Sequence, residues 1–147
     1  MMSSETVFYP CSGNLGFQLV SLDGCNYICI ILGETPSTYL EARDACADFQ
    51  GGRLVVADTI EKLIQIWELF QTEMWVGLQD MDVENEFLWS DGRYATSQEI
   101  NTLFTPGEPN NAGGNEDCIS VRHQNPWLND SPCQTRKLFV CEQYLLS

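Results

Sequence analysis

The chain has 147 residues, of which 44% are hydrophobic and 11% aromatic. It can therefore form one globular domain with a hydrophobic core, and the composition excludes a disordered chain. Twenty-one Asp and Glu residues against seven Lys and Arg residues give a formal charge of -14. This acidity disfavours nucleic acid and anionic lipid as partners and suits a hard cation such as calcium. No apolar run approaches the ~20 residues that span a bilayer, so membrane insertion is not expected.

The cysteine content indicates an extracellular protein. Seven cysteines are typical of a disulfide framework formed in an oxidising compartment, so we expect secretion. The absence of a C-x-x-C pair and the presence of a single histidine disfavour zinc. Six cysteines could pair and one would be left over. The first residues lack the basic and apolar regions of a signal peptide, so a secreted form would be the mature chain.

The N-terminal part of the chain is predicted to contain two strands and then a helix. Residues 17–20 and 27–32 are short apolar runs with strand character. The helix is expected to begin at Thr38, because Thr38 and Glu41 form a capping box, and to end at Gly51.

The remainder of the chain is predicted to contain one more helix, several strands and a long loop. The second helix is expected to begin at Asp58, where Asp58 and Glu61 would form a capping box. Residues 98–114 show little periodicity, and a loop of this length in a compact domain is usually functional. Helices followed by strands indicate an α+β domain. The apolar stripe of the second helix consists of Ile60, Leu63, Ile64, Trp67 and Phe70, and the later strands are expected at 74–78, 87–89, 118–121 and 138–141.

Five side chains in and after the long loop offer oxygen ligands. They carry three carboxylates, which would place a charge of -3 around a divalent cation, and calcium accepts six to eight oxygens. With the carbonyl of Asp130 added, one or two positions would stay open for a ligand hydroxyl. A cis peptide bond before Pro109 would turn the side chains on either side of the proline to the same side. The five residues are Glu108, Asn110, Glu116, Asn129 and Asp130.

The order and spacing of several short motifs resemble those of a C-type lectin domain over about Cys11 to Glu142. The resemblance implies an α+β fold of the C-type lectin type, with two helices packed on small antiparallel sheets and a long calcium-binding loop region. It assigns residues 1–10 to an N-terminal extension, 11–142 to the domain and 143–147 to a C-terminal tail. The motifs are Glu41-Ala42-Arg43, Gly51-Gly52-Arg53-Leu54, Trp75-Val76-Gly77-Leu78, Trp89-Ser90-Asp91-Gly92, Gly107-Glu108-Pro109-Asn110-Asn111, Glu116-Asp117-Cys118, Asn129-Asp130-Ser131-Pro132-Cys133 and Cys141-Glu142.

The same resemblance assigns roles to the oxygen ligands. All five would hold a principal Ca2+ ion, and four of them would also contact sugar, namely Glu108, Asn110, Glu116 and Asn129. It further implies an auxiliary metal site at Asp80, Glu84 and Asp117. Asn111 stands where several family members have Asp, and one charge fewer is expected to weaken that second site.

Three disulfide bonds are implied by the resemblance: Cys46–Cys141, Cys118–Cys133 and Cys11–Cys25. Cys29 then has no partner, and it is either a buried thiol or an intermolecular bridge. Its position within an apolar run favours burial.

Two departures from the family pattern are expected to reshape the sugar-facing surface. Leu128 stands where the family usually has Trp before Asn-Asp, and Phe104 stands where it has Trp before Gly-Glu-Pro-Asn.

The function implied is calcium-dependent binding of glycans of the mannose, fucose or N-acetylglucosamine type, in recognition of cell-surface or microbial sugars and hence in innate immunity. Glu-Pro-Asn resembles the members that bind these sugars, whereas galactose binders usually carry Gln-Pro-Asp. One shallow site would bind with a Kd of about 1 mM, so avidity would call for a homo-oligomer. The alternatives are a lectin-like domain that binds a protein or another non-sugar ligand, and a glycoside hydrolase with two carboxylates. The hydrolase is disfavoured because the cation would occupy every candidate acid, so no enzyme activity is expected.

Overall fold

The computed structural model describes residues 11, 16–22, 27–109 and 116–143. One mixed sheet runs in the strand order β1-β2-β8-β4-β6-β7, with β3 paired to β8 and β5 paired to β4. Strands β4 and β8 pair in parallel. The elements are β1 (Gln18–Ser21), β2 (Tyr27–Ser37), α1 (Tyr39–Ala47), β3 (Gly52–Leu54), α2 (Ile60–Phe70), β4 (Met74–Gln79), β5 (Leu88–Trp89), α3 (Ser97–Leu103), β6 (Cys118–Val121), β7 (Leu128–Ser131) and β8 (Lys137–Gln143).

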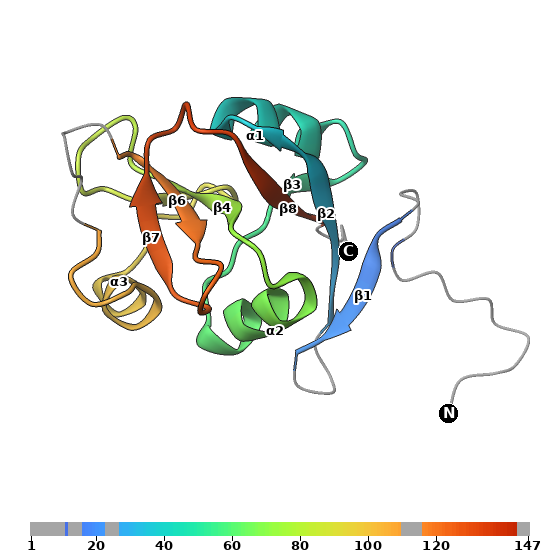
Figure 1. The fold of residues 1–147 in the computed structure, drawn as a ribbon, viewed down its shortest axis with the longest axis horizontal. Helices are drawn as coiled ribbons and strands as arrows, with labels where there is room; N and C mark the ends of the chain where they lie inside the picture. The colour runs from blue at the N-terminus through green and yellow to red at the C-terminus, as the bar shows by residue number, and fades with distance from the viewer. Residues whose placement is uncertain (1–10, 12–15, 23–26, 110–115, 144–147) are drawn as a thin grey trace, which may run out of the picture.

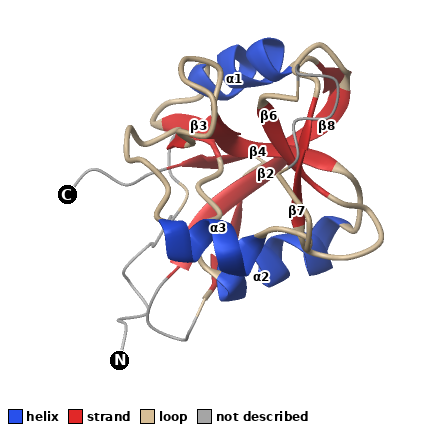
Figure 2. Ribbon diagram, turned by 90° about the vertical axis from the view of Figure 1, so that its left-hand side faces the viewer, coloured by secondary structure: helices blue, strands red, loops and turns tan. Residues whose placement is uncertain are grey.

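The helices lie on two sides of the sheet. Helix α1 covers one side, and α2 and α3 lie at the other (Figures 1 and 2). The α+β class is therefore confirmed, although the described strands form one continuous mixed sheet and three helices are present where two were expected. No helix among the described residues has the length and apolar character needed to cross a membrane.

The helix starts follow local capping chemistry. The capping box of Thr38 and Glu41 forms as predicted at the start of α1. The prediction for α2 is wrong by one residue, because the side chain of Thr59 accepts the backbone N–H of Lys62 and is the N-cap. Asp58 instead accepts from the guanidinium of Arg93 at 3.0 Å.

Helix α3 was not expected, since it lies in the segment predicted to be a loop. It begins with a capping box formed by Thr96 and Glu99. The carboxylate of Glu99 also accepts the indole N–H of Trp89 at 3.2 Å and a hydrogen bond from Arg93. These contacts hold a seven-residue helix whose apolar face is small.

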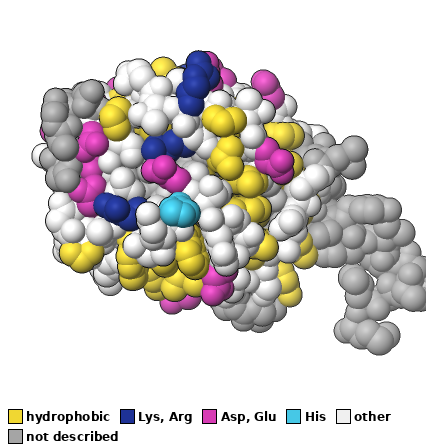
Figure 3. Space-filling model, viewed as in Figure 1, with side chains coloured by type: hydrophobic (Ala, Val, Ile, Leu, Met, Phe, Trp, Pro, Cys, Tyr) yellow, Lys and Arg dark blue, Asp and Glu magenta, His cyan; other side chains and the backbone are white. Residues whose placement is uncertain are grey.

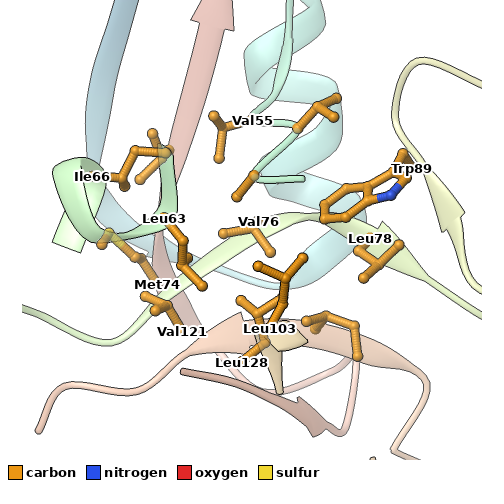
Figure 4. Packing of buried hydrophobic residues seen from close by; sticks show 14 of the residues in the cluster. Val55, Leu63, Ile66, Met74, Val76, Leu78, Trp89, Leu103, Val121 and Leu128 are labelled. Carbon is orange, nitrogen blue, oxygen red and sulfur yellow. The ribbon is translucent and has the colours of Figure 1, made fainter. Parts of the chain in front are cut away.

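The two residues that depart from the family pattern lie in the core between the sheet and helices α2 and α3. Side chains from α2, α3 and the central strands point toward one another there (Figure 4). Leu128 is fully buried and Phe104 is 5% exposed, with the Phe104 ring 5.9 Å from that of Phe87. Both substituted positions therefore lie in the core, and neither side chain is itself part of the exposed surface.

Three disulfide bonds join the described residues. Cys46 pairs with Cys141 and Cys118 pairs with Cys133, which are two of the pairs that the resemblance implied. The third prediction is wrong, because Cys11 pairs with Cys29 across a Cα–Cα distance of 5.6 Å, which is ordinary for a disulfide bond. Cys29 lies in β2 opposite Leu19 of β1, so it is neither unpaired nor a free thiol. Cys25 lies outside the described residues.

Candidate functional site

Strand β7 places two of the predicted ligands next to each other. In its ladder with β6, Asn129 lies opposite Ser120 and Asp130 lies opposite Ile119. Successive side chains of a strand point to opposite faces. Asp130 is only 2% exposed, whereas Asn129 is partly buried.

The segment before Pro109 brings a second carboxylate to β7. The backbone N–H of Thr105 donates to the carbonyl of Leu128 at 2.9 Å, and that of Glu108 donates to the carbonyl of Thr105 at 2.8 Å. These two bonds tie Glu108 to the start of β7. The Glu108–Pro109 peptide bond is cis, which is the form considered in the sequence analysis.

The charges of two further acids act on Glu108. The pKa of Glu108 is raised to about 7, chiefly by burial, then by a hydrogen bond with Asp130 and the charge of Asp130, and further by the charge of Glu116. A divalent cation would oppose this shift, because it stabilises the ionised carboxylate.

The amide of Asn129 is arranged in a way that fits a cation. Its Nδ2 donates to the carbonyl of Asp130 at 3.2 Å and to Oγ of Ser131 at 3.5 Å. Its Oδ1 is buried and has no hydrogen-bond partner in the part of the chain that the structure describes. A buried, unpartnered amide oxygen on the residue before Asp130 is suited to calcium, which binds carbonyl and carboxylate oxygens.

Two serine hydroxyl groups near this amide were not identified from the sequence as part of the site. Oγ of Ser131 lies 3.2 Å from Oγ of Ser120, and both residues are buried. Ser131 therefore holds the amide of Asn129, and Ser120 in turn contacts Ser131. A serine directly after Asn-Asp was the available signal, but only the folded structure shows its contact with Ser120.

Two of the predicted residues lie outside the described part of the chain, namely Asn110 and Asn111. The four other predicted ligands of the principal ion are described, and they come from two distant stretches of sequence.

A second acidic cluster forms where the auxiliary ion was predicted. Carboxylate oxygens of Asp80, Glu84 and Asp117 all lie within 4.8 Å of one another. One oxygen of Asp80 accepts the backbone N–H of Asn85 at 2.8 Å. The other oxygen of Asp80 and one oxygen of Asp117 are buried without a partner among the described residues.

The pKa of Asp80 is raised in this cluster. Burial raises its pKa to about 6, and the charges of Glu84 and Asp117 add to the increase, while the hydrogen bond from Asn85 opposes it. This cluster also fits a hard divalent cation.

Acidic side chains are not confined to these clusters. On the face drawn in Figure 3, Asp and Glu occur in several groups, and the Lys and Arg side chains stand apart from one another. No continuous basic surface of the kind that binds a phosphate backbone is seen on that face.

Comparison with known proteins gives a consistent result. The family model described as "Lectin C-type domain" matches residues 35–143. The chain is 36% identical over 116 residues to the low affinity immunoglobulin epsilon Fc receptor of Mus musculus, covering 78% of this chain and 34% of the receptor. It is 31% identical over 147 residues to the hepatic lectin of Gallus gallus, covering 97% and 66%. It is 35% identical over 120 residues to the hemolymph lipopolysaccharide-binding protein of Periplaneta americana, covering 74% and 46%. The chain thus spans between about a third and two thirds of these relatives.

Solved structures show the same fold. The C-type lectin CEL-I from Cucumaria echinata superposes with a TM-score of 0.74 at 20% identity, covering 88% of this chain and 95% of CEL-I. The carbohydrate-recognition domain of cow CD23, crystallised in the presence of a GlcNAc2Man3 oligosaccharide, gives a TM-score of 0.72 at 26% identity, with 91% and 97% covered.

Proposed function

The chain belongs to the C-type lectin domain family, whose members are binding proteins and not enzymes, and we propose that it binds glycans through a calcium ion at the β7 site. The buried Oδ1 of Asn129, which is unpartnered among the described residues, is the observation that best supports this proposal. The ligands proposed for the ion are Glu108, Asn110, Glu116, Asn129 and Asp130.

The proposed ligands differ in charge and in hydrogen-bonding capacity, and therefore in their roles. Asp130 is buried and supplies negative charge, while Glu108 and Glu116 can accept protons from sugar hydroxyl groups. Asn110 and Asn129 can donate amide hydrogens to hydroxyl oxygens. Calcium, when bound, would supply an electrophilic centre for hydroxyl lone pairs. This pattern of acceptors and donors selects for the geometry of a pair of neighbouring hydroxyl groups.

We expect mannose, fucose or N-acetylglucosamine as the preferred sugars, because Glu108-Pro109-Asn110 resembles the motif of the family members that bind these sugars. A second cation at Asp80, Glu84 and Asp117 is part of the proposal. So are secretion, the domain limits of 11–142, recognition of cell-surface or microbial glycans, and assembly into a homo-oligomer for avidity.

A glycan array run with calcium and with EDTA tests the proposal. We expect mannose-type glycans to be retained with calcium and released with EDTA. The double variant Glu108→Gln with Asn110→Asp should shift retention toward galactose. Binding that persists in EDTA, or an array without any glycan signal, would contradict the proposal and favour a lectin-like domain with a protein ligand.

A further inference from the structure

A pocket of about 590 Å³ lies between α1, β3 and β5, and its lining includes Gln79 and Met81, the neighbours of Asp80 in the chain. Its volume is within the range of sites for small organic ligands, roughly 300–1,000 Å³. Apolar groups of Met81, Leu88 and Trp89 form part of its lining. None of the residues proposed to hold calcium or sugar belongs to this lining, so the pocket is separate from the proposed lectin site.

The charges that line the pocket are unusual for this chain. They consist of two guanidinium groups, from Arg43 and Arg53, and one carboxylate, from Asp91. The chain has only seven Lys and Arg residues and a formal charge of -14. A lining with a surplus of positive charge is therefore opposite in sign to the molecule as a whole.

Arg53 is fixed in place by a buried acid. Its Nε donates to Oε2 of Glu142 at 2.7 Å, and the Glu142 side chain is 4% exposed. The other oxygen of Glu142 lies 3.7 Å from Nζ of Lys62, so two cations share this carboxylate. Glu142 does not line the pocket. Arg53 is thus a positioned cation at one wall.

The ion pair of Arg43 with Asp44 is weak enough for a ligand to replace Asp44. It pairs with Asp44 at 3.2 Å, but the two side chains are 56% and 72% exposed, and such a surface pair contributes little in water. Arg43 follows Tyr39 by one helical turn on α1, and both line the pocket. The charge of Arg43 acts on the Tyr39 hydroxyl, lowering a pKa that burial raises well above its ordinary range. The phenol and the guanidinium are therefore close, and both can donate hydrogen bonds.

We infer that this pocket is a second binding site, for a small organic anion whose carboxylate or sulfate group meets Arg43 and whose apolar body lies against Leu88 and Trp89. Guanidinium groups recognise carboxylate and sulfate through paired hydrogen bonds. A neutral ligand of the same shape would form no ion pair with Arg43. The site requires no calcium.

The test uses 2-naphthoate, its neutral isostere 2-naphthamide, octanoate and acetate, titrated by calorimetry and by amide NMR shifts. The titration is carried out in EDTA, so that its result does not depend on the proposed lectin activity. We expect saturable 2-naphthoate binding with a Kd of about 0.1–1 mM, and shifts at Gly52, Ser90 and Gly92. Octanoate and acetate distinguish an aliphatic body from an aromatic one and from the acid group alone.

Two variants and a matched control complete the design. Arg43→Gln should weaken 2-naphthoate by about tenfold or more while leaving the amide isostere unchanged. Ala47→Trp, at an exposed position of the lining, should weaken both compounds by filling the pocket. Arg136→Gln removes an equally exposed arginine outside the lining and should change nothing. Equal affinity for naphthoate and naphthamide, shifts located elsewhere, or no saturation would overturn the inference.

Discussion

Neutralising Glu108 should stabilise the metal-free protein and at the same time reduce its response to calcium. The pKa of Glu108 is raised from 4.5 to about 7 by burial, by Asp130 and by Glu116. Because the pKa in the folded state is raised, the contribution of this group to stability is complete below pH 4.5 and is lost as the pH rises through about 7. Glu108→Gln carries no charge and avoids that loss.

The magnitude follows from the size of the shift and from the exposure of the group. The full shift would correspond to about 3 kcal/mol at 1.36 kcal/mol per pH unit. Glu108 is partly exposed, so solvent screening reduces the value to about 1 kcal/mol. In a domain of this size that is about 2–4 °C in Tm. Calcium at about 100 times its Kd should stabilise the unmodified chain by about 2.7 kcal/mol, and the variant by much less.

Thermal melting followed across pH, in EDTA and in calcium, measures both effects. In EDTA the Tm of Glu108→Gln should match that of the parent chain near pH 4 and exceed it above pH 7. Glu68→Gln, which changes an exposed acid on α2, is the matched control and should shift neither curve. The reasoning fails if Glu108→Gln melts lower than the parent in EDTA above neutral pH, or gains the same stability from calcium.

Three further predictions concern other parts of the molecule. Mannose-column retention should fall as the pH drops below about 7, because protons compete with calcium for a carboxylate whose pKa is raised to that value; retention unchanged at pH 5 would contradict this. Ser131→Ala should weaken calcium binding about two- to fivefold, since the Asn129 amide loses an acceptor, and Ser131→Thr should restore it. Terbium luminescence titration measures the affinity of both variants. Equal affinities of Ser131→Ala and the parent chain would refute the role of Ser131 in holding this amide. Peptide mapping without reduction should recover Cys11 joined to Cys29, and any other partner for Cys11 would show that the pairing is wrong.

The sequence predicted helices where a cap and an apolar period coincide. Thr38 and Glu41 cap α1 as expected, because the capping box is a local motif. The same motif at Thr96 and Glu99 begins α3, but that helix spans only seven residues and the segment around it lacks a clear period. The partners of Glu99 that hold α3, including the indole of Trp89, are contacts that periodicity does not report.

Disulfide pairing shows the same limit at longer range. Cysteine spacing is compatible with several pairings, and the choice depends on which side chains the strand register brings together. Cys29 lies opposite Leu19 in the β1–β2 ladder and bonds to Cys11. A one-residue change of register would turn a different side chain to that face. The family pattern therefore predicted the two pairs around the sheet core but not the one at its edge.

The two acidic clusters are joined at the start of β6. The charge of Glu116 acts on Glu108, and the next residue, Asp117, belongs to the cluster with Asp80 and Glu84, while the carbonyl of Asp117 accepts the backbone N–H of Asp80 at 2.9 Å. The Cys118–Cys133 disulfide then fixes this point to the chain that follows β7. A cation in either cluster would restrain the backbone that positions a ligand of the other, so binding at one site should favour binding at the other. Burial raises the pKa values of Glu108 and Asp80 most, and the charges of neighbouring acids add to the increase, so a cation at either place would favour the ionised carboxylates.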